Sequence, residues 1–300
     1  MTGTLAPSGL AGWDADDHAA ALSAYELTVD LLPGDWPHPQ PGQTPSSFFA
    51  DAFAAYPVGE PALLTGYYEP ELSGSAVRTE EFSHPLYAPP AGFQPGQVWH
   101  DRQEIETGNL LSGRELVWLD SPLEAFLAQV QGSVRVRLAD GQSRRLGFAG
   151  KNGHPYTSIG KELIRRGVLS ETNASVAAIR DWANRYPEMV RDLLWVNRSF
   201  VFFRPLDLPE TAGPLGALQR SVTPLRSLAV DPDHIPLGAP VWVEWDGQAA
   251  LMIAQDTGSA IKGMARGDIY FGSGRVAGER AGALNTMGRL TVLRPKGAAS

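Results

Sequence analysis

The sequence predicts a protein that is mainly β with helices, built from two β-containing modules. Three observations support this. From Ser199 onward, short and strongly apolar segments alternate with Gly, Pro or Asp, a pattern typical of a compact β-barrel or sandwich. The 32 glycines and 24 prolines favour a strand- and loop-rich fold over a helical bundle. A separate pair of alternating segments surrounds Asp140-Gly141, which is a β-hairpin signal.

The N-terminal part carries helices before its first strand. Residues 14–32 have a helical apolar stripe, with Asp14 or Asp16 as the expected cap. Residues 46–56 are predicted as a second helix. Residues 63–75 begin as a short apolar strand and continue with aromatic and polar residues, and residues 79–113 are expected to form irregular strands and loops.

The middle of the chain contains a helix, a hairpin and further helices. Ser121-Pro122-Leu123-Glu124 is a helix start, because serine caps, proline fits the first turn and Glu124 can complete a capping box. Val134, Val136 and Leu138 then alternate with arginines up to the Asp-Gly turn. Helices are predicted at residues 158–166, 175–185 and 188–196. The strands of the C-terminal part are expected at residues 199–203, 227–231, 240–245, 250–256, 268–272 and 288–293.

Size and composition limit the class of protein. A chain of 300 residues with 43% hydrophobic and 19% charged residues fits one large or two medium domains with a sizeable core. The net charge of -8, without a block of Lys or Arg, argues against a nucleic-acid partner. The absence of cysteine excludes disulfides, thiolate metal sites and a cysteine nucleophile. The six histidines lack ligand-like spacing, so we expect no metal and no cofactor, with only a carboxylate site left open.

Membrane and export signals are also absent from the sequence. No run is long and apolar enough to span a bilayer. The first 20 residues have neither a basic n-region nor an apolar h-region, so no export signal is expected in them. Either the protein stays in the cytoplasm or a signal has been removed.

Aspartates at strand ends are the strongest candidates for chemistry. Asp256 and Asp268 each border an apolar run, and a Gly-rich loop with Lys262 separates them. Apolar surroundings raise a carboxyl pKa towards the range of general acid/base catalysis. The alternative is that Asp256 caps a turn and Asp268 is a solvated loop residue. Asp231 also follows an apolar strand, which makes a shared carboxylate site more plausible.

Three polar clusters are candidates for ligand contacts. In residues 65–69, adjacent tyrosines on a strand point to opposite faces, so one can pack while the other faces a cleft. Residues 131–133 and 150–156 are polar loops of the kind that binds sugar hydroxyls and acetamido groups. For residues 65–69 the pattern alone favours two aromatic rings that fill a core. The two loops could equally be turns in which glycine supplies a positive φ.

Several segments, in one order, resemble the family of membrane-bound lytic murein transglycosylase A (MltA). The matching segments are LLTGYYEP (Leu63–Pro70), PLYAPP (Pro85–Pro90), QGS (Gln131–Ser133), FAGKNGHPYTSIGK (Phe148–Lys161), NRSFVFF (Asn197–Phe203), SLAVDPDHIPLG (Ser227–Gly238), AQDTGSAIKG (Ala254–Gly263) and GDIYFG (Gly267–Gly272). They cover most of the chain from about residue 60. The resemblance implies a double-psi β-barrel formed by residues 1–70 plus 197–300, a β-rich domain of residues 71–196 inserted into it, and a glycan groove between the two.

The resemblance also implies an activity. Members of the family cleave the β-1,4 bond between N-acetylmuramic acid and N-acetylglucosamine in peptidoglycan without water, leaving a 1,6-anhydromuramic end. By resemblance Asp268 is the single general acid and then general base, and Asp256 supports it. The expected glycan-contacting residues are Thr65, Tyr68, Gln131, Ser133 and Lys151, with Asp231 as a weaker candidate.

The family further implies a periplasmic protein, associated in some members with the outer membrane. Its expected partners are peptidoglycan glycan strands, together with proteins of wall synthesis or cell division, and we expect a monomer. The chain departs from the family in lacking a lipidation cysteine and a signal, and Ser259 stands where a second glycine is usual.

Two other functions are open at this point. One is an inverting glycoside hydrolase in which Asp268 is the acid and Asp256 or Asp231 the base, which requires carboxyl groups roughly 6.5–9.5 Å apart. The other is a glycan-binding module without catalytic activity.

Overall fold

The computed structural model describes residues 5–59 and 61–297. The chain forms two compact units. Unit 1 comprises the described residues of Met1–Tyr68, Glu210–Gly272 and Val276–Ser300, and unit 2 comprises Glu69–Pro209 with Ser273–Arg275. Unit 2 is therefore inserted into unit 1 along the sequence.

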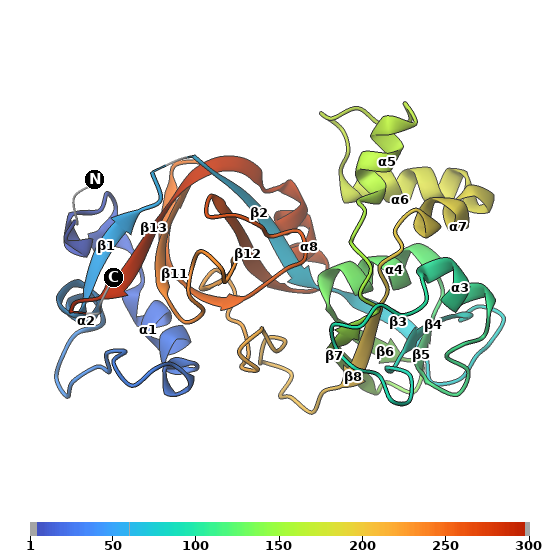
Figure 1. The fold of residues 1–300 in the computed structure, drawn as a ribbon, viewed down its shortest axis with the longest axis horizontal. Helices are drawn as coiled ribbons and strands as arrows, with labels where there is room; N and C mark the ends of the chain where they lie inside the picture. The colour runs from blue at the N-terminus through green and yellow to red at the C-terminus, as the bar shows by residue number, and fades with distance from the viewer. Residues whose placement is uncertain (1–4, 60, 298–300) are drawn as a thin grey trace. The chain divides into compact units, whose positions relative to one another are not determined.

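Unit 1 is built on a sheet that closes on itself (Figure 1). Its strands follow the order β1-β13-β10-β11-β9-β12-β2, and β13 pairs with β2 as well, so every strand except β1 lies in a closed ring. The strands are β1 (Phe53–Pro57), β2 (Ala62–Glu69), β9 (Ser227–Ala229), β10 (Pro240–Trp245), β11 (Gln248–Asp256), β12 (Arg266–Ser273) and β13 (Asn285–Pro295). β9 runs parallel to β11 and antiparallel to β12.

Apolar side chains from these strands fill the ring. Leu64, Leu228, Val241 and Ile269, from four different strands, are fully buried in one cluster. Burial of such side chains contributes roughly 1.5–3 kcal/mol each to folding, as an upper estimate. This closed and densely filled ring gives β2 and β12 a rigid setting.

The helices of unit 1 pack outside the ring. They are α1 (His18–Glu26), α2 (Pro45–Ala52) and α8 (Gly274–Ala283), with the 3-10 turns η1 (Pro7–Gly9), η2 (Trp13–Ala15) and η3 (Val29–Leu31). An aromatic cluster of Tyr25, Phe48, Phe49 and Phe53 joins α1, α2 and β1 in a second core.

Two expectations for this part were wrong in detail. Asp17, rather than Asp14 or Asp16, caps α1 by accepting the Ala20 amide, while Asp16 pairs with Arg226. The predicted helix 46–56 ends at Ala52, because the residues after it pair with β13 as strand β1. Sheet pairing there outweighs local helix propensity.

Unit 2 contains a second sheet in the order β4-β5-β3-β6-β7-β8. Its strands are β3 (Glu71–Ser75), β4 (His84–Tyr87), β5 (Glu115–Leu119), β6 (Ser133–Leu138), β7 (Ser143–Lys151) and β8 (Val201–Pro205). Its helices are α3 (Arg102–Thr107), α4 (Pro122–Gln131), α5 (Ile159–Arg165), α6 (Val176–Arg185) and α7 (Pro187–Trp195).

Most of the elements predicted in this part are confirmed. Ser121 caps α4, the β6–β7 hairpin turns at the Asp-Gly pair, and the three later helices are present. Glu124 does not complete a capping box, because its carboxylate pairs with Arg180. The region 79–113 is more ordered than predicted, since it contains β4 and α3. A full capping box of Asp101 and Glu104, a pattern visible in the sequence, starts α3.

The unit boundaries differ from the predicted domain boundaries at residues 69–70, 197–209 and 273–275, all of which lie in unit 2. Residues 197–209 were assigned to the barrel, but β8 pairs with β7 in the sheet of unit 2, so this segment lies in unit 2 up to Pro209. The mixed fold with two sheets is confirmed. The double-psi topology expected for the ring stays a prediction.

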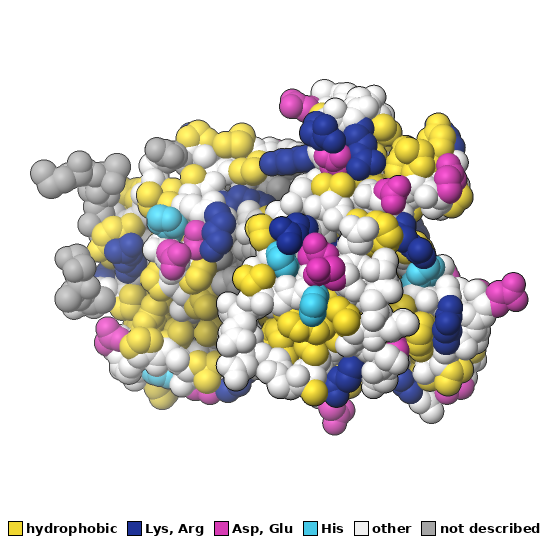
Figure 2. Space-filling model, turned by 45° about the vertical axis from the view of Figure 1, so that its right-hand side comes forward, with side chains coloured by type: hydrophobic (Ala, Val, Ile, Leu, Met, Phe, Trp, Pro, Cys, Tyr) yellow, Lys and Arg dark blue, Asp and Glu magenta, His cyan; other side chains and the backbone are white. Residues whose placement is uncertain are grey.

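The surface carries charges of both signs. On the face shown in Figure 2, Lys and Arg side chains are interspersed with Asp and Glu rather than gathered in one block. Within residues 5–59 and 61–297, no helix has the length and hydropathy needed to cross a bilayer.

Candidate active site

Asp268 lies on β12, beside β2, in unit 1. The Thr65 hydroxyl of β2 donates a hydrogen bond to Asp268 Oδ1. Arg266 Nη2 in turn donates to Thr65 Oγ1 over 2.7 Å. The guanidinium occupies a lone pair of the hydroxyl, so the hydroxyl hydrogen is directed at the carboxylate. Arg266, Thr65 and Asp268 thus form a directed chain of donors that ends on one carboxylate oxygen.

This series of hydrogen bonds has two consequences for the proton of Asp268. Burial is the largest influence and raises the pKa of Asp268, while the Thr65 hydrogen bond and the Arg266 charge partly oppose it. Because Oδ1 accepts from Thr65, the proton of the acid form belongs on Oδ2. Asp268 is therefore a half-buried carboxyl group with an elevated pKa and a defined acidic oxygen.

Asp256 lies at the end of β11, on the other side of β9. Both aspartates are register partners of Ala229 in β9, one from each neighbouring strand. The register of β11 shifts just before Asp256, but both carboxyl groups act on Tyr67 and Asp268 acts on Asp256, so the two groups lie on the same side. Of the three aspartates that made a shared carboxylate site plausible, the structure brings Asp256 and Asp268 together.

Asp256 is held by several donors. Tyr67 OH donates to Oδ2 over 2.9 Å, and the Thr257 amide donates to Oδ1 over 2.9 Å. Burial nevertheless raises the pKa of Asp256 to about 6, and the negative charge of Asp268 adds to the increase. Asp256 therefore takes up a proton more readily when Asp268 is ionised.

Arg266 was missed by the sequence reasoning, and Tyr67 belonged to the candidate cluster 65–69, from which Tyr68 was chosen instead. The Tyr67 ring packs against Tyr270 of β12, with 5.1 Å between the ring centroids and 46° between the ring planes, and burial raises the pKa of Tyr67 well above its usual value. A signal was present, because Thr65 and Tyr67, like Arg266 and Asp268, are two residues apart on a strand and so share a face. Period-two spacing around each candidate residue would have identified both.

Tyr68, predicted as a glycan contact, points to the other face of β2. A Cβ placed on Gly278 of α8 would lie 2.7 Å from the Tyr68 ring, so the ring packs closely against this helix. Gly66 has a related role, because a Cβ there would lie 2.7 Å from the Ala281 backbone and the Phe271 ring. The glycine in the Thr-Gly-Tyr-Tyr segment thus allows α8 to approach β2.

Asp231 contacts different residues from those that Asp256 and Asp268 contact. Its carboxylate accepts from the Gly263 amide over 2.8 Å and contacts Lys262 Nζ at 3.4 Å. The Gly263 hydrogen bond is the main reason that the pKa of Asp231 is lowered. Asp231 thereby anchors the loop between β11 and β12. Its predicted substrate contact stays a prediction.

Gln131, Ser133 and Lys151 belong to unit 2. Gln131 ends α4, Gly132 follows with φ 78°, and Ser133 starts β6 as a buried residue. Lys151 ends β7 and is half-buried. The structure brings Thr65, Asp256 and Asp268 together in unit 1, and places these three in the other unit.

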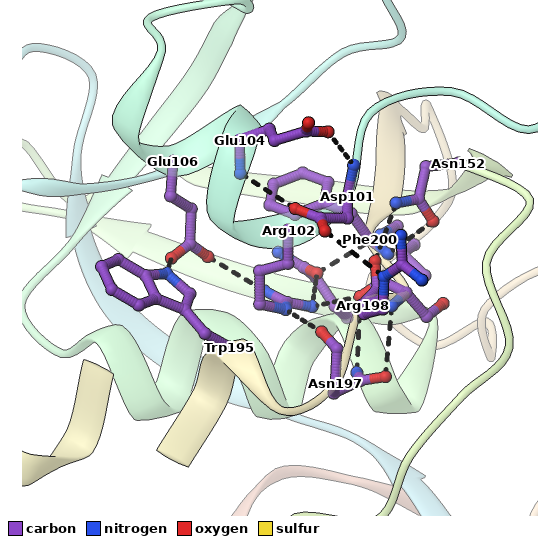
Figure 3. A network of polar contacts seen from close by, with 12 residues as sticks. Asp101, Arg102, Glu104, Glu106, Asn152, Trp195, Asn197, Arg198 and Phe200 are labelled. Carbon is purple, nitrogen blue, oxygen red and sulfur yellow. Dashed lines mark hydrogen bonds and ion pairs between the residues drawn. The ribbon is translucent and has the colours of Figure 1, made fainter. Parts of the chain in front are cut away.

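The loop after Lys151 is fixed by buried amides (Figure 3). Asn152 is fully buried, donates to the carbonyls of His100 and Arg198 and accepts the Phe200 amide over 2.8 Å. Asn197 accepts the Thr157 amide over 2.9 Å. These hydrogen bonds attach the loop to the segments that precede α3 and β8, and they thereby set the position of Lys151.

Arg102 lies at the centre of the same network in Figure 3. It is 2% exposed and donates to the carbonyls of Asn197 and Ser199 and to Glu106. Its guanidinium lies 4.7 Å and 5.0 Å from the ring centroids of Phe126 and Phe200. The buried Arg102 side chain thus connects α3 to the segment that precedes β8.

No group of three or more His, Cys, Asp or Glu side chains suited to a metal ion occurs within the described part of the chain. The arrangement at Asp268 can instead donate and accept a proton directly.

Comparison with known proteins identifies the protein family that this sequence matches. The sequence matches the profile of the MltA-specific insert domain over residues 63–204 and that of the 3D domain over residues 226–294. Membrane-bound lytic murein transglycosylase A of Escherichia coli (strain K12) is 39% identical over an alignment 249 residues long, which covers 77% of this chain and 65% of that protein. The chain thus spans about 65% of the length of this curated relative.

Solved structures are similar over nearly the whole chain. A membrane-bound lytic murein transglycosylase from Agrobacterium tumefaciens is 31% identical with a TM-score of 0.86, covering 98% of this chain and 97% of that chain. E. coli MltA with bound chitohexaose is 33% identical with a TM-score of 0.75, covering 93% of this chain and 85% of that chain.

Proposed function

The chain belongs to the MltA family of lytic murein transglycosylases, and on that premise we propose that it cleaves peptidoglycan glycan strands without water. The bond cleaved is the β-1,4 linkage between N-acetylmuramic acid and N-acetylglucosamine, and the product carries a 1,6-anhydromuramic end. The observation that carries the proposal is the Asp268 carboxyl group, whose pKa is raised and whose Oδ1 is engaged by Thr65. Its Oδ2 is left to carry the catalytic proton.

In the first step Asp268 acts as a general acid. Oδ2 protonates the glycosidic oxygen while the bond from that oxygen to C1 of the muramic residue breaks. The leaving N-acetylglucosamine keeps the proton as a hydroxyl hydrogen. Asp268 becomes a carboxylate, which the Thr65 hydroxyl and the Arg266 charge stabilise.

In the second step the same carboxylate acts as a general base. It accepts the proton of the muramic C6 hydroxyl while the C6 oxygen forms a bond to C1, which closes the anhydro ring and restores the acid. No water is consumed, and the masses of the two products sum to that of the substrate. Because the nucleophile belongs to the substrate, the rate depends on how the sugar is held.

Asp256 is proposed as a supporting group. Tyr67, the Thr257 amide and the Ala217 amide all bond to its carboxylate. With three donors in place, the carboxylate is suited to fixing Tyr67 and tuning the charge beside Asp268 more than to activating water. The hydrolytic alternative, with Asp256 or Asp231 as base, is distinguished by its products.

The proposed ligand is a glycan strand. A family member binds chitohexaose, a linear glycan ligand. We propose Thr65, Tyr68, Gln131, Ser133 and Lys151 as contacts for the strand, with Asp231 acting through its loop. We also propose the bacterial cell envelope as the place of action, since the relatives are named as membrane-bound enzymes.

Product analysis tests the proposal. Purified sacculi are incubated with the protein, and the soluble products are identified by mass spectrometry. Anhydromuramic ends, about 18 Da lighter than reducing ends because one water is missing, support the proposal. Reducing ends contradict it and favour the hydrolase, whereas binding to sacculi without soluble products favours the binding module.

Matched variants assign the acid. Asp268→Asn should abolish cleavage and retain binding to sacculi. Asp140→Asn, at the exposed β6–β7 turn, is the control and keeps the Asp-Gly turn geometry as Asn-Gly. An active Asp268→Asn enzyme would rule out the single acid/base mechanism.

A further inference from the structure

A fully buried carboxylate lies at the end of β2, outside the site described above. Glu69 is 0% exposed. Arg145 binds it through two parallel hydrogen bonds of 2.7 Å, and Arg135 Nε donates to Oε2 over 2.8 Å. Ser273 Oγ also donates to Oε2, over 2.7 Å. We refer to Glu69, Arg135, Arg145 and Ser273 as the Glu69 cluster.

The Glu69 cluster joins the ends of the two strands that carry the proposed acid and its donor. Glu69 is the last residue of β2, and Ser273 is the last residue of β12. β2 and β12 are hydrogen-bonded neighbours in the sheet. Thr65 lies four residues before Glu69 on the same face of β2, and Asp268 lies five residues before Ser273 on β12.

Register matters at this pair of strands. A slip of one residue in a strand moves every side chain to the opposite face. Thr65 would then leave Asp268, and Tyr67 would leave Asp256. A side-chain link at the far ends of both strands opposes such movement, because it fixes the two ends to one point.

The chemistry of the cluster favours a positional role over a stabilising one. Removing a carboxylate and two guanidinium groups from water carries a desolvation penalty that offsets much of their mutual attraction. Well-packed apolar residues in the same place often give a protein of equal or greater stability. The best attested use of such buried polar groups is to select one register. Both carboxylate oxygens of Glu69 accept hydrogen bonds from partners in a defined geometry. We call a link of this kind, which holds two strands in one register, a register lock.

We propose that Glu69 and Ser273 are positioning residues that hold β2 in register with β12 and so keep the Thr65 hydroxyl on Asp268. This inference rests on the proposed function for its catalytic consequence. The structural part, the effect of the link on the Thr65–Asp268 contact, is independent of any activity.

Ser273→Ala is the sharpest perturbation, because it removes one hydroxyl and leaves the Glu69–arginine pairs in place. Loss of the link should loosen the Thr65 contact, and loss of that contact raises the pKa of Asp268, since the Thr65 hydrogen bond lowers it. The pKa is measured by NMR titration of ¹³C-labelled aspartate carboxyls, with the Asp268 signal assigned from Asp268→Asn. We expect an upward change in the pKa of Asp268 and a loss of about tenfold in kcat with KM little changed.

Glu69→Gln is a second variant that weakens both arginine pairs, and its folding is checked by circular dichroism. If it folds, its Asp268 signal should titrate in the same direction. Glu124→Gln is the matched control, because Glu124 also forms a two-bond pair with an arginine, Arg180, on the α4 surface of unit 2. It should leave the Asp268 titration unchanged.

A Thr65→Val background separates a positional from a general effect. If Ser273 acts through Thr65, adding Ser273→Ala to Thr65→Val should change neither the titration nor kcat further. Fully additive effects, or an Asp268 titration in Ser273→Ala equal to that of the unsubstituted protein, would overturn the inference. If the titration changes as expected but sacculi yield no anhydro product, the proposed function fails and the register lock stands.

Discussion

Asp256→Asn should increase the stability of the protein at neutral pH relative to acidic pH. Burial raises the pKa of Asp256 to about 6 from 3.8, so the folded state holds its proton to higher pH than the unfolded chain does. The free energy of unfolding therefore falls as the pH rises from about 4 to about 6. Asparagine does not titrate, so the variant does not lose stability in this way.

The magnitude follows from the two pKa values. At 1.36 kcal/mol per pKa unit, the difference between about 6 and 3.8 corresponds to about 3 kcal/mol. Asparagine also preserves the shape and can bond to both Tyr67 and the Thr257 amide. Relative to the unsubstituted protein, Asp256→Asn should thus gain about 3 kcal/mol between about pH 3.5 and about pH 7.5.

Urea denaturation followed by tryptophan fluorescence at both pH values measures this gain. Asp231→Asn is the opposite control, because the pKa of Asp231 is lowered by the Gly263 amide, so its carboxylate contributes stability that is lost on acidification. A stability difference between Asp256→Asn and the unsubstituted protein that is the same at both pH values would refute the reasoning. Lower cleavage activity in this more stable variant would fit a site in which function and stability conflict.

Three further predictions concern single residues. Thr65→Val should lower the cleavage rate about tenfold and move the alkaline limb of the pH–rate profile upward, because Asp268 must be protonated and loses the hydrogen bond that lowers its pKa; an unmoved limb would contradict this. Gly66→Ala should cost about 1–3 kcal/mol in urea denaturation, because the new Cβ meets the α8 backbone; a neutral result would refute that contact. Arg102→Met should cost about 3 kcal/mol or more, because it removes the Arg102 donors from two buried carbonyls and breaks the pair with Glu106; stability equal to the unsubstituted protein would show that the network is dispensable.

Local signals identified many elements correctly. Ser121-Pro122 marked the start of α4, and Asp140-Gly141 marked the β6–β7 turn, since caps and tight turns depend on a few adjacent residues. The end of the helix at Ala52 was not predictable in this way. Its strand partner, β13, lies more than 230 residues away along the chain.

The candidate site likewise has some features that the sequence predicted and others that depend on contacts between distant strands. Asp256 and Asp268 were recognised as strand-end carboxylates, and the family resemblance, which is now confirmed, singled out Asp268. Their shared register partner in β9 was not visible in the sequence, because it depends on which strands are neighbours. The hydrogen bonds of Tyr67 and Arg266 depend on the same strand pairing, although period-two spacing already placed Tyr67 on the face of Thr65 and Arg266 on that of Asp268.

The sequence by itself determined the family, the mixed two-module composition and the choice of Asp268 as the candidate acid, because ordered motifs and local periodicity survive without knowledge of contacts. Only the tertiary structure decided which oxygen of Asp268 is engaged, why Asp256 has a raised pKa and how Glu69 connects β2 to β12. Those properties arise from hydrogen-bond direction, burial and strand pairing between residues up to 204 positions apart. Such distances in sequence become contacts only when the ring of strands closes.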